Sequence, residues 1–381
     1  MSVPSTVQAE LDTALSDAVP ALASAAAAVI GIAGEPVARA GIGELIRYAD
    51  ERATTPAADR PAADLDTWYD LASLTKLYTT VAALILVERD GLDPARPVRH
   101  WLPEYVDDRV SLEHLLTHTG GLPSGVPLRG TEPGTRRGLV LDTGPQRDPG
   151  TTHRYSDVSY ILIGWILETH VGVGLDKLIG DLITAPLKLT DTGFQPLRRP
   201  DPPRNIAATE YKDGQLRHGL VHDETALLLG EVSGHAGLFA TVTDLWRFAE
   251  ALRTNALLSP ASTAEMIRPR VAADGFGQGL GVRIGDPAIA GRLSGSYGHS
   301  GFTGTSLVVD PVRDVTVVLT TNRVHPVRTH SQINPVRCAI ADIAYREQRR
   351  KHAGTSSSTV ALRLPTKGQW LHGALRRRAR R

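Results

Sequence analysis

The sequence predicts an α+β fold in which one antiparallel sheet is built from both chain ends and flanked by helices. Short strand-like segments lie near the N-terminus and again between about residues 280 and 320. Between about 95 and 250 the apolar residues follow helical spacing, interrupted by loops rich in proline and glycine. Because strands at both ends bracket this helical middle, the simplest assembly pairs them in one sheet and places a mainly helical subdomain beside it.

The first elements are a helix and a hairpin. Helical periodicity covers residues 5–18, where a serine and a threonine at the start are suitable capping residues. Two strands at about 25–33 and 36–42 flank a Gly-Glu-Pro turn. A loop then leads to an almost wholly apolar helix that begins at Ser73 and continues to Val87.

The later elements change in character along the chain. Apolar helical patterns recur at three places, 157–169, 175–183 and 243–253. Short β-branched segments follow and predict three strands, Leu280–Ile284, Thr305–Val309 and Val315–Thr320. A helix at about 334–347 completes the body of the chain.

Length and composition agree with one large globular unit. The 381 residues are 41% hydrophobic and 22% charged, which suffices for a sizeable core. We expect a single domain over 1–347, with a sheet subdomain at about 1–80 and 275–347 and a helical subdomain at about 81–274.

Charge is divided unevenly between this body and a C-terminal tail. Residues 348–381 hold ten Lys/Arg and no Asp/Glu, whereas 1–347 carry 32 Lys/Arg against 41 Asp/Glu. The negative body gives no electrostatic reason to expect nucleic acid as a partner. The tail composition predicts a disordered, solvated extension; contact with anionic lipid or RNA, with Trp370 and Leu371 as apolar anchors, is the alternative.

The compartment expected from the sequence is the cytoplasm. The single cysteine, Cys338, excludes an internal disulfide, and its position in a helix predicts a core thiol. The N-terminal segment lacks the basic start of a secretory signal, and no apolar run is long enough to span a bilayer.

The most informative motif is Ser73-Leu74-Thr75-Lys76 at the start of the apolar helix. A hydroxyl and an amine three residues apart lie on the same helix face. The positive end of the helix dipole stabilises negative charge on a reacting oxygen, and desolvation favours a neutral lysine near neutral pH. These features suit nucleophilic serine catalysis without a histidine base.

Two further motifs follow in order. Tyr155-Ser156-Asp157 comes after a Pro-Gly turn and before a helix, and His299-Ser300-Gly301 lies in a glycine-rich stretch that enters a strand. With the Ser-x-x-Lys tetrad, this ordered set resembles the three motifs of the serine β-lactamase and penicillin-binding protein family. The resemblance spans about residues 20–345. Leu112–Leu122 is similar to a loop of its class C and esterase-like branch.

The resemblance implies a β-lactamase/transpeptidase-like α/β-sandwich and an acyl-serine mechanism. Ser73 would attack a carbonyl, and Lys76 or Tyr155 would act as the base. The backbone N–H groups of Ser73 and Phe302, the latter on an edge strand, would hold the oxyanion. Neither a metal nor an organic cofactor is implied. The partner would be a small-molecule or peptide-like ester or amide, bound also by Asp157, His299, Ser300 and Gly301.

The second and third motifs each depart from the family pattern. Asp157 replaces an asparagine; its carboxylate would raise the Lys76 pKa and move the base role to Tyr155, or else orient Lys76 by a hydrogen bond. His299 replaces a lysine and, with a reference pKa near 6.5, would be only partly charged at pH 7. Both departures weaken the case for penicillin as substrate, and neither harms acyl transfer.

Two histidine-containing blocks further resemble a subgroup of cytoplasmic hydrolases in this family. They are His222-Asp223-Glu224 and the segment Gly234–Phe239, which contains His235. Some members of that subgroup are thought to cleave muramyl amides, so His222 and His235 are candidate pocket residues. Their alternative role is as hydrogen-bonded loop residues. Ester hydrolysis, β-lactamase activity, D-alanyl-D-alanine peptidase activity and transesterification all remain open.

Three other functional classes compete with a serine hydrolase of this kind. A metal-dependent hydrolase could use His114 and His118, four residues apart, with His222 and Asp223. An α/β-hydrolase would need a Gly-x-Ser-x-Gly pentapeptide, which the sequence lacks. A binding or sensor module could retain the fold with weak catalysis, although a pure binder does not need the three motifs.

Overall fold

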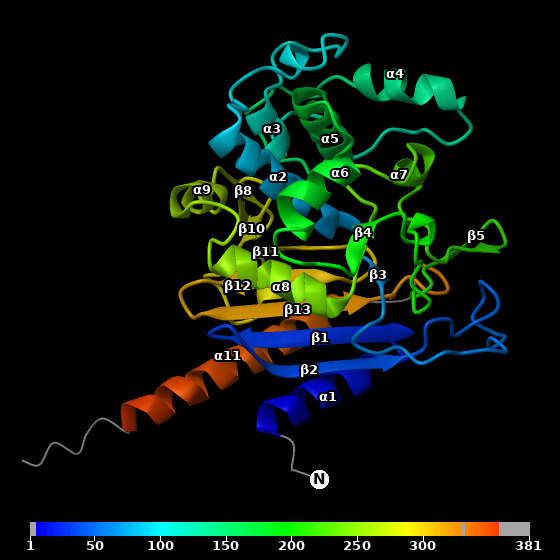
Figure 1. Cartoon of the computed structure of the whole chain (residues 1–381), viewed down its shortest axis with the longest axis vertical. Coiled ribbons are helices and arrows are strands. Elements are labelled where there is room, and N and C mark those ends of the chain that lie inside the picture. The colour runs from blue at the N-terminus through cyan, green and yellow to red at the C-terminus, as the bar shows by residue number, and fades with distance from the viewer. Residues whose placement is uncertain (1–4, 329–331, 358–381) are drawn as a thin grey trace, which may run out of the picture.

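The computed structural model describes residues 5–328 and 332–357, and Figure 1 shows their arrangement. These residues form an eight-stranded sheet in the order β2-β1-β13-β12-β11-β10-β9-β8, in which every neighbouring pair is antiparallel. The strands are β1 (Ala25–Ile32), β2 (Glu35–Gly43), β8 (Val271–Ala273), β9 (Phe276–Gln278), β10 (Arg283–Ile284), β11 (Tyr297–Ser300), β12 (Ser306–Asp310) and β13 (Val315–Thr321).

The two chain ends meet inside this sheet. Strand β1 pairs with β13 in a register that runs from Ala26 opposite Thr321 to Ile32 opposite Val315. This pairing confirms the predicted sheet built from both ends of the chain. It also brings residues almost 300 positions apart in sequence into adjacent strands.

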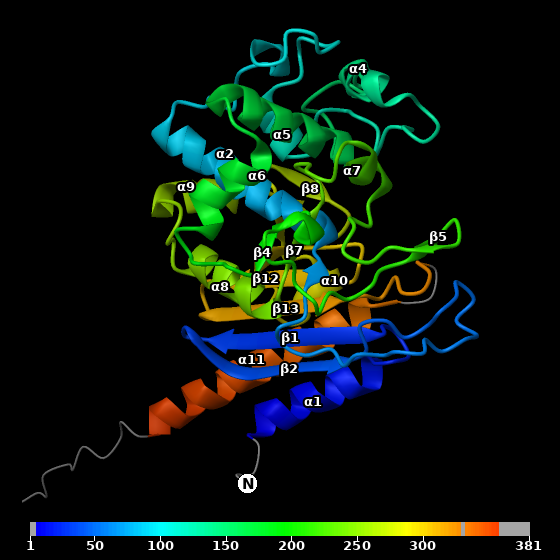
Figure 2. The same ribbon diagram turned by 45° about the vertical axis from the view of Figure 1, so that its right-hand side comes forward.

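Both faces of the central strands are buried, which explains why β1 reads as a continuous apolar run. Ala25, Ala27 and Val29 face the larger core, whereas Ala26 and Ala28 face the smaller one. The smaller core lies against α1 (Thr6–Ala18) and α11 (Asn334–Ser357). Figures 1 and 2 show these two helices side by side beneath β1 and β2.

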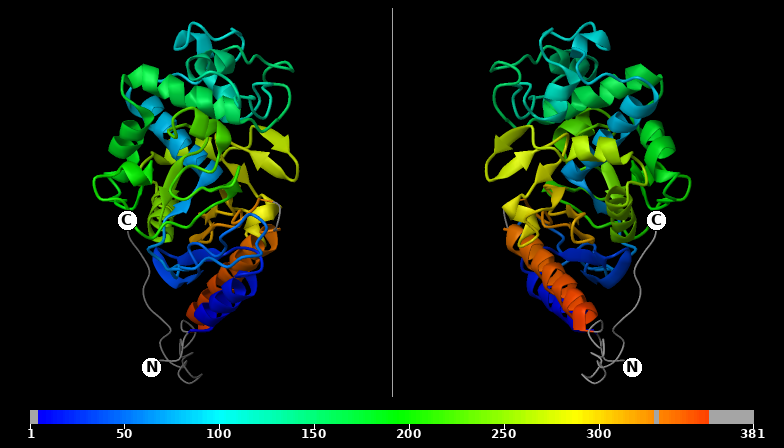
Figure 3. Two further views of the ribbon diagram at one scale, coloured as in Figure 1. Left: turned by 90° about the vertical axis from the view of Figure 1, so that its right-hand side faces the viewer. Right: turned by 90° about the vertical axis from the view of Figure 1, so that its left-hand side faces the viewer.

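The larger core contains the helical subdomain on the opposite face of the sheet (Figure 3). Its central helix is α2 (Thr75–Arg89), in which every residue from Thr75 to Leu86 is buried. Around it lie α3 (Leu112–Leu116), α4 (Arg136–Leu141), α5 (Asp157–Val171), α6 (Leu175–Ile179), α7 (Glu224–Leu228), α8 (Val242–Arg253), α9 (Pro260–Met266) and α10 (Pro287–Ala290). Helix α5 ends at Gly172, whose positive φ of 79° suits a glycine.

Short elements complete the chain. A three-stranded sheet has the order β3-β7-β4, with β3 (Tyr69–Asp70), β7 (Leu238–Ala240) and β4 (Thr192–Phe194), and β5 (Tyr211–Lys212) pairs with β6 (Gln215–Leu216). Single helical turns lie at Ala72–Leu74, Val98–His100, Pro133–Thr135, Gly180–Thr184 and Pro196–Arg198.

Several predicted boundaries differ from the structure. The strand expected over Leu280–Ile284 contains only Arg283 and Ile284, because Gly281 adopts a positive φ of 67° that interrupts extended backbone. The C-terminal helix continues ten residues past 347, so part of the predicted tail is helical. The remainder of that tail, 358–381, lies outside the described residues.

Among the described residues, no single helix is both long and apolar enough to cross a membrane. Helix α5 and the segment Leu175–Thr184 reach that length and hydropathy only when taken together, and the two are bent by 81° relative to each other. Most of α5, from Val158 to Leu167, packs into the larger core.

Candidate active site

Ser73 lies in the helical turn Ala72–Leu74 that leads directly into α2, so the α-helix begins two residues later than predicted. The preceding residue, Ala72, has a φ of 48°, a left-handed conformation that costs a non-glycine residue free energy. Asp70 fixes this turn because its Oδ1 accepts the Ala72 N–H at 2.7 Å. Its Oδ2 accepts the His222 N–H at 2.6 Å, which ties the turn to a distant loop.

Lys76 is completely buried beneath Ser73. Its ammonium group donates a hydrogen bond to Ser73 Oγ at 2.9 Å and to the His235 carbonyl oxygen at 3.0 Å. Asp157 Oδ1 forms an ion pair with it at 2.8 Å. Tyr155 completes the group, with its ring centroid 4.9 Å from Lys76 Nζ. The structure therefore brings Ser73, Lys76, Tyr155 and Asp157 together.

The protonation state of Lys76 differs from the expectation drawn from desolvation alone. Burial by itself lowers the pKa of this amine, but the negative charge of Asp157 and a hydrogen bond with Tyr155 outweigh it and raise the pKa above its ordinary value. Lys76 is therefore an ammonium ion at neutral pH. The prediction of a neutral lysine is wrong, and the alternative in which Asp157 keeps it charged agrees with the structure.

The segment that carries Tyr155 and Asp157 is held at both sides. Ser156 is the N-cap of α5: its Oγ accepts the Ser159 N–H at 3.3 Å and donates to the Pro123 carbonyl oxygen at 2.6 Å. His118 Nδ1 accepts the Ser156 N–H at 3.1 Å, and its ring lies 4.6 Å from that of Tyr155. His118 thus positions Tyr155, a role that the sequence did not suggest.

The third motif lies on β11, beside Tyr155. The His299 ring is 5.9 Å from the Tyr155 ring, and its Nδ1 donates to the Ser300 carbonyl oxygen at 2.8 Å. Burial, together with the nearby positive charges of Arg283 and Lys76, lowers the His299 pKa well below its ordinary value. His299 is therefore neutral at pH 7, which corrects the expectation of partial charge.

The edge position expected for this strand is also wrong. Strand β11 lies between β12 and β10, so it is internal to the sheet. Gly301 and Phe302 leave it in a tight turn. A Cβ on Gly301 would lie 2.1 Å from Thr305 Oγ1 and 2.5 Å from the Leu71 carbonyl oxygen, so glycine is required for this close approach.

A cavity of about 330 Å³ opens beside Ser73, and its charge is supplied by arginines that the sequence analysis missed. We call this cavity the arginine lobe; its lining consists of Ser73, Tyr155, Arg283, Ser300, Gly301, Phe302, Arg323, Gln332, Ile333, Asn334 and Arg337. Arg283 approaches Ser300 Oγ at 3.4 Å and lies 5.4 Å from the Tyr155 ring centroid. Positive charge that His299 does not provide is therefore present in the same region.

A second cavity, of about 320 Å³, shares Ser73, Tyr155 and Phe302 with the first. We call it the His222 lobe; its other lining residues are Ala72, Asp157, His222, Asp223, Glu224, Thr225, Ala236 and Arg328. The Phe302 ring stacks on the His222 ring at 5.7 Å and stands where the two lobes meet. The sequence-predicted residue His222 thus lines a cavity beside Ser73.

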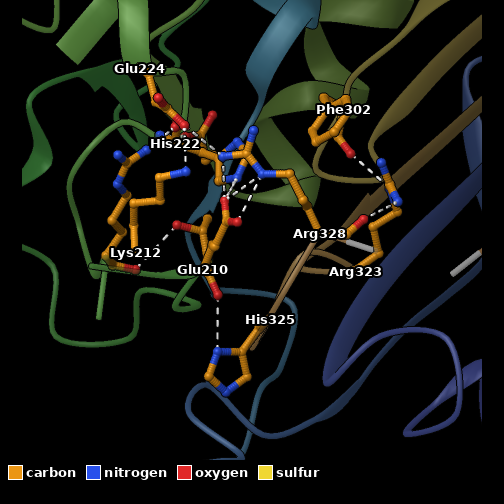
Figure 4. Close-up of polar contacts among 11 residues, drawn as sticks. Glu210, Lys212, His222, Glu224, Phe302, Arg323, His325 and Arg328 are labelled. Carbon is orange, nitrogen blue, oxygen red and sulfur yellow. Dashed lines mark hydrogen bonds and ion pairs between the residues drawn. The ribbon is translucent and has the colours of Figure 1, made fainter. Parts of the chain in front are cut away.

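Polar contacts fix the wall of the His222 lobe (Figure 4). Glu210 accepts hydrogen bonds from His222 Nε2 at 2.6 Å and from Arg328 at 2.6 to 2.9 Å. Burial raises the Glu210 pKa, but these hydrogen bonds prevail and lower it to about 2. Arg328 also pairs with Glu224 at 3.0 Å.

His235, the other predicted pocket histidine, lies behind this wall. Its ring bridges Ser233 Oγ and Asp223 Oδ1, each at 2.8 Å, while its carbonyl oxygen accepts from Lys76. The side chain therefore supports Asp223 and does not line either lobe.

The histidines considered for a metal have other roles. His114 Nδ1 accepts the Ser111 N–H at 3.2 Å in a capping box, and His118 positions the Tyr155 segment as described. Over residues 5–328 and 332–357, no group of three or more His, Cys, Asp or Glu side chains converges as a metal site.

Ser73 lies over a buried lysine, beside a tyrosine and between an antiparallel sheet and a helical subdomain, an arrangement suited to a serine hydrolase. The chain belongs to the β-lactamase family: residues 15–340 match the sequence model of that family, which is described as Beta-lactamase. It is accordingly a serine hydrolase of that family.

Named relatives agree with this assignment. The chain is 33% identical over 313 residues to a putative D-alanyl-D-alanine carboxypeptidase of Escherichia coli K12, covering 71% of this chain and 72% of the relative. A protein of the same description from Salmonella agona is 30% identical over 316 residues, with 72% and 73% covered.

The solved structures are more distant in sequence and show the shared fold. EstCE1, a hydrolase with promiscuous acyltransferase activity, has a TM-score of 0.68 at 22% identity, covering 89% of this chain and 98% of its own. Unliganded simvastatin synthase from Aspergillus terreus has a TM-score of 0.68 at 21% identity, with 91% and 100% covered. The octameric penicillin-binding protein homologue from Pyrococcus abyssi has a TM-score of 0.67 at 21% identity, with 90% and 78% covered.

Proposed function

We propose that this enzyme hydrolyses a peptide-like amide or ester that bears a free carboxylate, a description that fits a D-alanyl-D-alanine-type carboxypeptidase. The observation that carries the proposal is the arginine lobe, where Arg283, Arg323 and Arg337 line a cavity that opens onto Ser73. Guanidinium groups bind carboxylates well because their donors match the two carboxylate oxygens. The described activity of the Escherichia coli relative is consistent with such a substrate.

In the proposed acylation step, Ser73 Oγ attacks the substrate carbonyl carbon and its proton passes to Tyr155. The Lys76 ammonium donates a hydrogen bond to Ser73 Oγ and stays charged beside Asp157, so Lys76 is not the proton acceptor and the base role falls to Tyr155. The N–H groups of Ser73 and Phe302 hold the oxyanion. When the tetrahedral intermediate collapses, Tyr155 gives its proton to the departing amine or alcohol.

Deacylation reverses these roles with water as the nucleophile. A water molecule attacks the acyl carbon and gives its proton to Tyr155, and Ser73 then departs and recovers that proton. An alcohol in place of water would give transesterification through the same steps. His299, Ser300 and Gly301 are proposed to hold the substrate along β11, where Ser300 Oγ faces Arg283.

The test compares a substrate with and without its carboxylate. We expect an N-acyl-D-alanyl-D-alanine peptide to be hydrolysed with a kcat/KM at least about 10-fold above that of its C-terminal amide. The reason is that the amide loses the charge-assisted hydrogen bonds to guanidinium groups, each stronger than a neutral one. Arg283→Gln should reduce this preference, and Ser73→Ala serves as the blank. Equal rates for acid and amide would contradict the proposal.

A second candidate is cleavage of a muramyl amide or a small ester. It is favoured by the presence of a lobe on each side of Phe302, both lined by Ser73, which leaves room for bulky groups on both sides of the scissile bond. A direct comparison of muramyl peptides, short-chain esters and nitrocefin with the D-alanyl peptide separates the candidates. A cytoplasmic location is a further proposal, which fractionation of cells that express the chain would test.

A further inference from the structure

The turn from Gly301 to Thr305 carries the Phe302 N–H, and a buried arginine from a different part of the chain holds it. Arg337 belongs to α11 and is only 6% exposed. Its Nη2 donates to the carbonyl oxygens of Gly301 and Thr305, each at 2.8 Å, and its Nε donates to that of Gly304 at 3.3 Å. One guanidinium group therefore contacts three of the five carbonyl oxygens of the turn.

The contact with Gly301 has a particular consequence. The Gly301 carbonyl and the Phe302 N–H belong to the same peptide group, which is planar, so an anchor on the oxygen also sets the direction of the N–H. A cationic donor on that oxygen further polarises the group, because hydrogen bonds along a chain strengthen one another. Arg337 thus acts on the opposite end of the amide that is proposed to bind the oxyanion.

Other contacts join this turn to the Ser73 segment. Thr303 Oγ1 donates to the Asp70 carbonyl oxygen at 2.7 Å, and Thr305 Oγ1 donates to the Leu71 carbonyl oxygen at 3.0 Å. The two remaining carbonyl oxygens of the turn also accept hydrogen bonds: that of Phe302 from Arg323 Nε at 2.7 Å (Figure 4), and that of Thr303 from Thr321 Oγ1 at 2.8 Å. Both proposed oxyanion donors are therefore held on one hydrogen-bonded frame.

The charge of Arg337 lies in an unfavourable electrostatic environment. Burial, with the nearby positive charges of Arg323 and Arg283, lowers its pKa to about 10. Burying the guanidinium charge away from water costs free energy, and the hydrogen bonds that it donates to carbonyl oxygens offset this cost. Arg337 Nη1 also donates a hydrogen bond to the amide oxygen of Asn334 at 2.7 Å.

We propose that Arg337 is a positioning residue for the oxyanion hole, which orients and polarises the Gly301–Phe302 peptide group. This inference rests on the proposed role of the Phe302 N–H and is independent of which substrate the enzyme takes. Arg337 also lines the arginine lobe, so a test must separate positioning of the amide from binding of a substrate carboxylate.

The separation is made with an uncharged reagent. An alkyl fluorophosphonate has no carboxylate, and its phosphoryl oxygen occupies the oxyanion hole when Ser73 displaces fluoride. We expect Arg337→Gln to lower the second-order rate constant of labelling by about 10 to 10²-fold, at or below the effect of removing one oxyanion donor. Arg337→Lys, which keeps the charge but cannot bridge three oxygens, should also be slower than the wild type.

A matched control lies on the same helix. Arg346→Gln removes an arginine that pairs with Glu10 at 2.5 Å and lines neither lobe, so this variant should label within about 2-fold of the wild type. If thermal melting shows that Arg337→Gln is not folded, the labelling rate of Arg337→Lys alone tests the inference. Labelling of folded Arg337 variants at the wild-type rate would overturn the inference, as would a defect seen only with carboxylated substrates.

A further measurement distinguishes positioning from a structural effect. Added guanidinium ion at millimolar concentration should partly restore labelling of Arg337→Gly and should not change Arg346→Gly; absence of rescue together with an unchanged rate of Arg337→Lys would overturn the inference. If the wild type itself is not labelled, or if Ser73→Ala still is, the proposed acyl-serine function fails first, and that outcome is recognisable by itself.

Discussion

Replacement of Asp157 by asparagine tests the ion pair that sets the charge of Lys76. The carboxylate oxygen lies 2.8 Å from Lys76 Nζ, for which Coulomb's law gives roughly 6 kcal/mol at an effective dielectric constant of about 20. The Asp157 side chain is 31% exposed, so screening by solvent reduces this value to about 2–4 kcal/mol. At about 1.4 kcal/mol per pKa unit, the Lys76 pKa should fall by about 1.5 to 3 units in Asp157→Asn.

The assay is the pH dependence of kcat/KM, or of fluorophosphonate labelling, for the wild type and Asp157→Asn. If charged Lys76 supports Tyr155 as the base, the variant should lose activity on the alkaline side at a lower pH than the wild type. If neutral Lys76 is the base, the variant should instead gain activity on the acidic side. Identical profiles, within about 0.3 pH unit, would refute the reasoning that Asp157 controls the charge of this amine.

Three further predictions follow from the same contacts. Lys76→Ala should lower kcat at least about 10²-fold because the proton relay loses its cation, and a normal kcat in steady-state assays would remove the mechanism. Burial lowers the His118 pKa well below 6.5, so the unfolded state binds the proton more readily and stability falls as pH drops below about 6.5, by at most about 1.4 kcal/mol per unit. His118→Asn, which keeps an acceptor for the Ser156 N–H, should flatten this acid dependence in denaturant titrations; an unflattened curve would assign it to other groups. Gly301→Ala should destabilise the fold by at least about 2 kcal/mol and reduce labelling of Ser73, because its Cβ would overlap two oxygen atoms. Gly295→Ala, whose Cβ would make only an ordinary contact with Arg313 Nη1 at 3.8 Å, should melt like the wild type.

The larger elements of this fold could be predicted because periodicity over ten or more residues is a strong local signal. Residues 5–18, the hairpin and α8 appear close to their expected positions. The small sheet β3-β7-β4 was not predicted, since strands of two or three residues are too short to show alternation. Its pairing is set by the tertiary position of the Ser73 segment, because Asp70 and Leu71 lie directly beside it.

The candidate site divides in the same way. Ser-x-x-Lys, Tyr-x-Asp and His-x-Gly are local motifs, and the residues they contain lie together as expected. The arginine lobe was missed because Arg323 follows Arg283 by 40 positions and Arg337 follows Arg323 by 14, with no motif linking them in an arginine-rich chain. These arginines lie on a strand, a turn and a helix, and no spacing rule in the sequence relates three such elements that come together only in the folded chain.

The sequence by itself determined the order of the larger elements and the family to which the chain belongs, because these depend on residue types and short-range spacing. Tertiary structure alone decided the charges. A buried lysine becomes more basic because an aspartate 81 residues away, together with Tyr155, reaches it. His299 becomes neutral because it is buried and lies near the positive charges of Arg283 and Lys76. The physical reason is that pKa values depend on distances of a few ångströms between groups, and the folded chain sets those distances.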